Sequence, residues 1–360
     1  MNYKDYVDKY FIRSKLILEK EKLNPWIVMQ IFTRKGPGKI AGINESIDFI
    51  KKFSDIEKQG GIIYSLQESD SYDANETIML IEAPIQSIIE FETIYLGILS
   101  ARTTRLNDKF CMRYHDIRNT AREIVNLAKR PVYYAGARHW HYMEDEMLNG
   151  YIKEGGFTNC STDIGAYKYF KQEGVGTVPH ALVIAFASKY GKRDATLQTA
   201  LAFDNWIDKK VPRVILVDTF NKEIIDSVKV ACTLKNNLYG IRLDTCGENY
   251  GENCDIVPID TYEQGHGVTI ELARRVRLAL NSYGFVNTKI ILSSGFADPT
   301  KVEAFIEAEK RLGIKLFDQL LVGQLFPSRS FTADIVMVNG ELLSKTGREY
   351  KENKRLRRLL

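Results

Sequence analysis

Residues 213–244 carry the pattern that decides the fold: Arg213-Val-Ile-Leu-Val-Asp218, a helical pattern over 221–236, and then Tyr239-Gly-Ile-Arg-Leu-Asp244. Each run is nearly continuous in apolar residues, which predicts a buried β-strand. Two such strands joined by a helix predict neighbouring strands of a parallel sheet, and both runs end in a carboxylate.

The same alternation extends in both directions from this unit. Further apolar runs that are expected to be strands lie at 132–136, 176–185, 289–295 and 319–323. Helices are expected between them at 144–154, from about 163 to 172, and at 195–208, about 264–283 and 299–312. So many strand–helix units favour a closed α/β barrel over an open sheet.

Residues before about 130 lack this regular alternation. Helices are expected at 8–22, 43–53 and 85–104, and strands at 26–32, 61–65 and 76–82. A basic, glycine-rich turn at 33–38 follows the first strand, and such turns can bind phosphate. The mixed order predicts a separate α+β domain.

Composition excludes several classes of function. The chain has 360 residues, 44% of them hydrophobic and 27% charged, which is typical of a globular protein. A net charge of +4 does not indicate a nucleic-acid partner. Seven basic residues follow Ser344, and we expect them to form a solvated end: Lys345, Arg348, Lys351, Lys354, Arg355, Arg357 and Arg358.

The cysteines and the apolar runs bear on location. The five cysteines lack the paired spacing of a zinc site, so reduced thiols in a cytoplasmic protein are expected. Residues 1–10 carry charge where a signal peptide needs an apolar core. The longest uncharged run, 174–188, is too short to span a bilayer, so no membrane segment is expected.

Polar residues follow four of the predicted barrel strands: Asp218-Thr219, Asp244-Thr245, Ser293-Ser-Gly295 and Gly323-Gln324. In α/β barrels the loops after the strands surround one mouth and build the active site. Capping of the next helix is the alternative for any single Asp or Thr. Four strands that end in this way favour a common site.

These residue types suit a phosphorylated sugar with a second anionic group. Arg138 and Arg242 can hold carboxylate or phosphate through paired hydrogen bonds. Glycine turns let backbone amides approach phosphate, and carboxylates can bind ribose hydroxyls or Mg²⁺.

His180 ends the stretch Gly174-Val-Gly-Thr-Val-Pro-His180 and precedes an apolar run. Pro179 fixes one backbone dihedral before the histidine, and the apolar run must pack inside the protein, so the imidazole is held at the edge of the core. A purely structural histidine at the start of a strand or helix is the alternative.

Six short motifs, taken in order, resemble those of nicotinate phosphoribosyltransferases: Ala135-Gly-Ala-Arg-His-Trp-His141, Gly176-Thr-Val-Pro-His180, Val217-Asp-Thr219, Gly240-Ile-Arg-Leu-Asp-Thr245, Ser293-Ser-Gly295 and Val322-Gly323. Two N-terminal stretches, Asp8-Lys-Tyr-Phe11 and Tyr64-Ser-Leu-Gln-Glu-Ser-Asp70, are similar to archaeal-type members. The resemblance covers nearly the whole chain.

The resemblance implies an irregular (β/α) barrel of the type II phosphoribosyltransferase kind. The barrel would span residues 116–326 and pack on an α+β domain built from 1–115 and 327–360. The implied reaction transfers phosphoribose from phosphoribosyl pyrophosphate to nicotinate in NAD salvage, with ATP hydrolysis and Mg²⁺. A homodimer or higher homo-oligomer with shared sites is also implied.

The resemblance also implies residue roles. His180 would accept a phosphoryl group from ATP, and Asp218 and Asp244 would act near ribose, pyrophosphate and Mg²⁺, with Asp218 a candidate to orient His180. Arg138 and Arg242 would face the pyridine carboxylate, and Ser161 would help to distinguish acid from amide.

The remaining implied roles concern phosphates and the partner subunit. The 5′-phosphate would bind at Ser294, Gly295, Gly323 and Gln324. Three residues would come across the dimer to the other subunit's site, Tyr10 at the pyridine and Arg34 and Ser330 at phosphate.

Two departures from the family pattern stand out. Ala135 lies where related enzymes often place an aromatic residue that stacks on the pyridine, and the chain lacks a cysteine-rich C-terminal extension, so a structural zinc is not expected. Three alternatives remain: a nicotinamide enzyme or a quinolinate enzyme on the same fold, and a non-catalytic binding paralogue.

Overall fold

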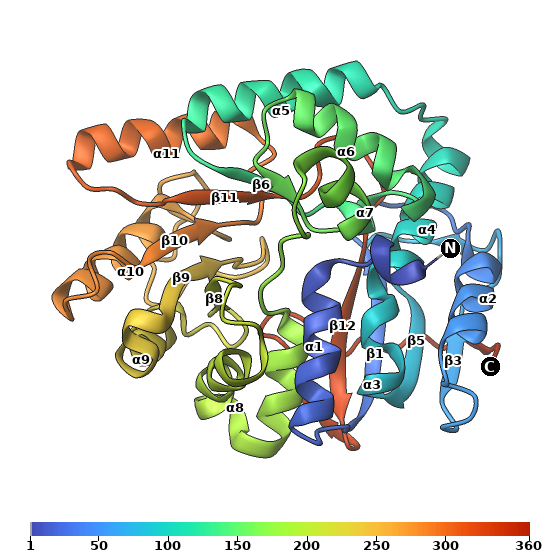
Figure 1. Cartoon of the computed structure of the whole chain (residues 1–360). Coiled ribbons are helices and arrows are strands. Elements are labelled where there is room, and N and C mark those ends of the chain that lie inside the picture. The colour runs from blue at the N-terminus through green and yellow to red at the C-terminus, as the bar shows by residue number, and fades with distance from the viewer. Residues whose placement is uncertain (1) are drawn as a thin grey trace.

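The computed structural model describes residues 2–360 and contains two six-stranded sheets (Figure 1). One sheet is antiparallel where its long strands pair, and the other is parallel. A two-stranded ribbon joins β2 (Gly38–Lys39) and β4 (Ser71–Tyr72). The two sheets therefore correspond to the two patterns in the sequence, the mixed order of elements before about residue 130 and the regular strand–helix alternation after it.

The antiparallel sheet brings both ends of the chain together. Its order is β13 (Glu341–Leu342), β12 (Phe331–Val338), β1 (Trp26–Thr33), β5 (Thr77–Pro84), β3 (Ile62–Ser65) and β14 (Arg357–Arg358). Residue Ile31 of β1 lies between Ala333 of β12 and Met79 of β5. The expected α+β domain requires such a sheet, built from both ends of the chain. The expected domain boundaries at 115/116 and 326/327 stay a prediction.

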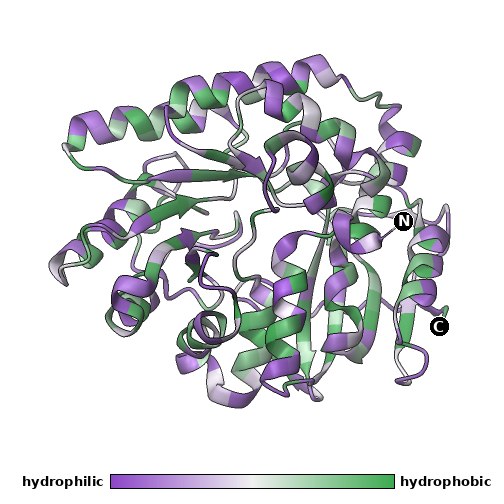
Figure 2. Ribbon diagram, viewed as in Figure 1, coloured by the Kyte–Doolittle hydropathy of each residue, from purple (hydrophilic) through white to green (hydrophobic). Residues whose placement is uncertain are grey.

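Helices that precede or follow its strands in the chain pack beside this sheet. They are α1 (Lys9–Lys20), α2 (Ile43–Phe53), α3 (Ile85–Ile88) and α4 (Glu92–Asp108). The expected single helix over 85–104 is broken, because Ile88 leaves helical geometry before the short turn Ile89–Phe91. Apolar residues gather in the strands and on the helix sides that face them (Figure 2).

The parallel sheet follows the expected strand–helix alternation. Its order is β7 (Asn159–Cys160), β6 (Val132–Tyr134), β11 (Gln319–Val322), β10 (Lys289–Leu292), β9 (Leu238–Leu243) and β8 (Arg213–Leu216). Its helices are α5 (Tyr114–Ala128), α6 (Asp145–Glu154), α7 (Asp163–Gly165), α9 (Glu223–Leu234), α10 (Ile270–Ser282) and α11 (Pro299–Leu312). Figure 1 shows α5 and α11 packed together on its outer side.

The sheet curls into a half-barrel and does not close, which corrects the expected closed barrel. In the part of the chain described, β7 and β8 are its edges. The expected strand over 176–185 is absent: Pro179 is extended and α8 (His180–Trp206) begins at once, with a break at Gly191. Residues 181–187 are all buried, and a buried apolar run does not distinguish helix from strand.

Helix α8 joins the two sheets. It packs against β8 of the parallel sheet and against β12 of the antiparallel sheet. Its first residue, His180, is therefore held between the two halves of the molecule. Of the helices within residues 2–360, none has the length and apolar character needed to cross a bilayer.

Candidate active site

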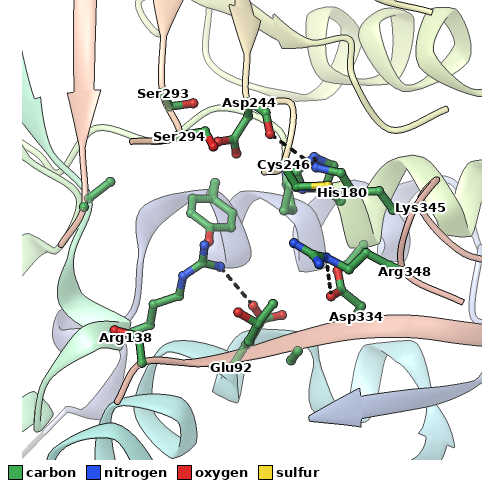
Figure 3. A pocket seen from close by; sticks show the side chains of 18 of the residues that line it. Glu92, Arg138, His180, Asp244, Cys246, Ser293, Ser294, Asp334, Lys345 and Arg348 are labelled. Atoms are coloured by element: carbon green, nitrogen blue, oxygen red, sulfur yellow. Dashed lines mark hydrogen bonds and ion pairs between the residues drawn. The ribbon is translucent and has the colours of Figure 1, made fainter. Parts of the chain in front are cut away.

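A cavity of about 380 Å³ lies between the two sheets (Figure 3). One wall is formed by the carboxyl ends of the parallel strands and includes Asp244 and Ser293–Gly295. The opposite wall is formed by the antiparallel sheet and the helix beside it and includes Asp334 and Glu92. Because the loops after parallel strands meet at one edge, the first wall was expected to be part of the site.

His180 contacts a buried ion pair. Its Nε2 lies 2.9 Å from Asp218 Oδ2 and 2.7 Å from Lys345 Nζ. Lys345 Nζ also donates to Asp218 Oδ2 at 2.6 Å and to the Asp244 carbonyl at 3.3 Å. Both contacts of the ring use Nε2, so Nδ1 is the nitrogen left to meet a ligand in the cavity.

The charges around His180 favour a neutral imidazole. Burial lowers the pKa of His180 and the neighbouring Lys345 lowers it further, against the opposing effect of Asp218. Burial alone would raise the pKa of Asp218, but Lys345 and His180 hold it well below its usual range. A neutral imidazole beside an ionised carboxylate has a lone pair available for attack.

Arg138 and Arg242 both reach the cavity, from different directions. Arg138 Nη1 lies 3.4 Å from Glu92 Oε1. Arg242 Nη1 donates to Thr177 Oγ1 at 3.0 Å and Nη2 donates to the Val178 carbonyl at 3.3 Å, while its buried Nε has no partner within residues 2–360. Arg242 thus also supports the segment that leads into His180.

The two predicted phosphate turns face the cavity. Ser294 and Gly295 adopt positive φ angles of 67° and 85°, and Lys301 Nζ donates to the Ser294 carbonyl at 3.1 Å. At the other turn, a Cβ on Gly323 would lie 3.0 Å from His139 Nε2. A larger side chain would therefore disturb each turn, at Gly295 through its left-handed backbone and at Gly323 through contact with His139.

A chain of polar side chains supports the Gly323 turn. Gln324 Nε2 donates to Ser328 Oγ at 3.1 Å, Ser328 Oγ lies 2.7 Å from Ser330 Oγ, and Ser330 Oγ lies 2.9 Å from His139 Nδ1. Burial, and then the charges of Arg138 and Arg34, lower the pKa of His139 to about 3. His139 is therefore neutral at physiological pH.

Comparison with known proteins places this architecture among phosphoribosyltransferases. Residues 8–102 match the family described as quinolinate phosphoribosyl transferase, N-terminal domain. A nicotinate phosphoribosyltransferase of Bacillus subtilis (strain 168) is 25% identical over 288 residues, which are 77% of this chain and 50% of the relative. The chain thus spans about half the length of that curated relative.

Two solved structures match nearly the whole chain. A nicotinate phosphoribosyltransferase from Porphyromonas gingivalis superposes with a TM-score of 0.66 at 11% identity, over 95% of this chain and 92% of that one. The enzyme of the same name from Vibrio cholerae gives 0.65 at 12% identity, over 95% and 87%. The fold is that of the nicotinate phosphoribosyltransferases. The resemblance inferred from the sequence motifs is confirmed.

Within this nicotinate phosphoribosyltransferase fold, three residues expected to act across a dimer lie at the cavity of their own chain. Tyr10, Arg34 and Ser330 were expected to reach the site of a partner subunit, but they line the cavity of their own chain. Helix α1 packs on α8 of the same chain, and β1 pairs with β12. These contacts bring the N-terminal residues to the cavity that holds His180.

Ser161 lies outside the main cavity. It lines a second cavity that shares Tyr10, Ala135 and Arg242 with the first. Its hydroxyl donates to the buried carboxylate of Asp8, and its carbonyl accepts from the Lys9 amide at 2.8 Å. The structure thus gives Ser161 a partner within the chain.

The two predicted Mg²⁺ ligands differ in access. Asp244 lines the cavity, and a single carboxylate with waters and substrate phosphates suits Mg²⁺. Asp218 is buried behind His180 and paired with Lys345, so it fits the role of orienting the histidine. Among residues 2–360, no three side chains of metal-binding type lie together.

Several cavity residues were not expected from the sequence, and part of the basic tail is buried instead of solvated. Lys345 and Arg348 were expected to be solvated, yet they are only 4% and 7% exposed and line the cavity. Arg348 Nη1 lies 2.8 Å from Glu248 Oε1, a carboxylate that also pairs with Arg34. Glu92 and Asp334 were missed as well, because no local motif marks them. His139 lies within the motif Ala135–His141 but was given no role.

Proposed function

We propose that this chain transfers phosphoribose from phosphoribosyl pyrophosphate to nicotinate, releasing nicotinate mononucleotide and pyrophosphate, and couples this reaction to ATP hydrolysis. One observation carries the proposal: a single cavity contains four arginines, Arg138 and Arg242 among them, two turns of the kind that binds phosphate, and a neutral histidine held by Asp218 and Lys345. The named relatives support the same activity.

The chemistry of the transfer suits these residues. The nicotinate ring nitrogen is a free nucleophile at neutral pH: it forms the bond to C1 of ribose as the bond from C1 to the pyrophosphate oxygen breaks, with the electron pair leaving on pyrophosphate. Catalysis then depends on positioning and on stabilising charge. Arg138 and Arg242 would hold the carboxylate, and the turns at Ser294–Gly295 and Gly323–Gln324 would hold the 5′-phosphate.

Coupling to ATP would proceed through His180. Its Nδ1 would form a bond to the γ-phosphorus as the bond to the ADP oxygen breaks, while the Nε2 proton is held by Asp218. Bound Mg²⁺ would neutralise phosphate charge in this site. Asp244 is the residue that would hold it, directly or through water.

The decisive experiment is mass detection of product from nicotinate, nicotinamide and quinolinate, each with and without ATP. We expect nicotinate mononucleotide to dominate and to increase with ATP. The quinolinate enzyme is the second candidate, since the matched N-terminal family carries that name. Preference for either other pyridine would overturn the proposal, and failure to bind phosphoribosyl pyrophosphate by calorimetry would favour a non-catalytic paralogue.

Assembly and location belong to the same proposal. We infer a cytoplasmic homodimer or higher homo-oligomer: the five cysteines are free thiols, as in reducing compartments, and the resemblance of the sequence motifs implies an oligomer. The dimer would not be needed to bring Tyr10, Arg34 and Ser330 to the cavity. Sedimentation of the purified chain tests the assembly independently of activity.

A further inference from the structure

Glu90, in the short turn before α4, and Glu92, the first residue of α4, are both buried but have different partners. Glu90 is 2% exposed and is neutralised by Lys15 Nζ at 2.6 Å, with a further hydrogen bond from Tyr3 at 2.9 Å. Glu92 is 4% exposed, and its carboxylate has a single side-chain partner within residues 2–360, Arg138 at 3.4 Å. Glu92 is also the one of the two that lines the cavity.

The groups that face Glu92 are largely acidic or neutral. Asp334 comes from β12, Asp8 from the residue before α1, Tyr10 from α1, Tyr95 from α4 itself, and Arg138 from the short turn Ala137–His139. Arg138 is the nearest cation, and Figure 3 shows it reaching across the cavity toward Glu92.

This environment favours the uncharged acid. Burial raises the pKa of Glu92 to about 8; Arg138 opposes the shift, and Asp334 and Asp8 add to it. Asp334 has one long contact of its own, with Arg348 Nε at 3.3 Å from its Oδ2. At neutral pH Glu92 is therefore mainly a carboxylic acid with an O–H group that can donate.

We propose that Glu92 is a specificity-determining residue of the pyridine site, donating a hydrogen bond from its carboxylic-acid form to the same substrate carboxylate that pairs with Arg138. The inference rests on the proposed function. A carboxylate offers about four acceptor sites. Arg138 would fill two of them, and Arg242 already donates from both Nη atoms to Thr177 and Val178, so a further donor beside Arg138 is useful. An ionised Glu92 would instead repel the anion.

Ionisation of Glu92 would make the choice between nicotinate and nicotinamide depend on pH. Below pH 8 the protonated Glu92 favours a pyridine carboxylate. Above pH 8 the ionised Glu92 repels the carboxylate and can accept from the NH₂ group of an amide. The ratio of nicotinate to nicotinamide affinity should therefore fall as pH rises through about 8.

The test measures nicotinate binding by calorimetry between about pH 6.5 and 9.5, a range that brackets the Glu92 pKa of about 8. For the wild type, affinity should approach a tenfold loss per pH unit above pH 8, because one proton is linked to binding. Glu92→Gln stays uncharged and still donates, so its affinity should not change with pH. Glu90→Gln is the matched control, since Glu90 does not line the cavity, and it should follow the wild type.

Proton uptake gives a second readout that needs no variant. Calorimetry of the wild type at about pH 8.5, in buffers of different ionisation enthalpy, should show uptake of most of one proton per nicotinate. No uptake, or the same pH dependence in wild type and Glu92→Gln, overturns the inference alone. No nicotinate binding at any pH overturns the proposed function together with it.

Discussion

The two walls of the cavity are built in different ways. On the wall of parallel strands, the functional side chains follow β9, β10 and β11 in short motifs such as Ser293-Ser-Gly295. On the opposite wall, Glu92, Asp334 and Arg348 come singly from a helix, a strand and the C-terminal segment. The first wall depends on local geometry at strand ends, and the second depends on how distant parts of the chain pack.

The difference has a consequence for function. The motif-built wall provides groups that any phosphorylated ribose would need, namely amide-lined turns and an acid for Mg²⁺. The packing-built wall sets the charge of the cavity: it contains two buried acids and the cation Lys345, which contacts His180. We therefore expect changes on the first wall to affect binding of the common substrate, and changes on the second to affect coupling and selectivity.

The largest expected effect is that of His180→Ala, where the two walls meet. ATP hydrolysis should fall by about 10³-fold or more, because the phosphoryl acceptor is removed. Nicotinate mononucleotide should still form without ATP, since the transfer itself uses no histidine. Parallel assays of ADP and mononucleotide check this, and ATP hydrolysis at the wild-type rate would exclude His180 as the acceptor.

Lys345→Met should have the second-largest effect, after His180→Ala, and it tests the packing-built wall directly. The variant leaves Asp218 ionised and buried with His180 alone, which should lower the free energy of unfolding by about 3–5 kcal/mol. ATP-dependent phosphorylation of His180 should fall by about 10²-fold, because an uncompensated Asp218 draws a proton onto the imidazole.

Lys351→Met is the matched control for that variant. Lys351 is exposed in the same C-terminal segment, so the change should leave both stability and phosphorylation near wild type. Urea unfolding and phosphohistidine detection measure the two effects separately. Equal effects of the two substitutions would show that Lys345 has no special role in the buried ion pair.

Sequence reasoning succeeded where geometry is local. The positions of the strand ends, of the arginines in the motifs and of the turns after β10 and β11 could be predicted, because a parallel strand followed by a helix places its next residues at one edge. The half-barrel opening could not be predicted, since residues 181–187 are equally apolar as strand or buried helix. Lys345 and Arg348 lie within a run of basic residues, and their burial depends on contacts with Asp218 and Glu248 far away in sequence.

Gly323→Ala should have a moderate effect confined to the motif-built wall. The new Cβ would lie 3.0 Å from His139 Nε2, so the turn or the histidine must shift by a few tenths of an ångström. We expect about a tenfold higher KM for phosphoribosyl pyrophosphate and unchanged nicotinate affinity, because small misplacements of a bound group are costly. The double variant with His139→Ala should recover part of the loss, and steady-state kinetics of the three variants decide whether the contact is responsible.

The smallest expected effect comes from mixing two variant chains that each carry one defect in ATP-coupled activity, and it tests whether both walls belong to one chain. Arg34→Ala and His180→Ala alter residues that line the same cavity from the N-terminal sheet and from α8. If each site is complete in its own chain, as the placement of Tyr10, Arg34 and Ser330 indicates, then every mixed dimer still has one defect in each site. ATP-coupled activity of the mixture should therefore equal the average of the two variants measured alone.

If the walls came from different subunits, mixed dimers would contain one site with both defects and one intact site, and activity would rise with the fraction of mixed dimers. In an equal mixture about half of the dimers would be mixed, each with one intact site out of two. Recovery to about a quarter of the wild-type rate would therefore contradict a site complete in one chain.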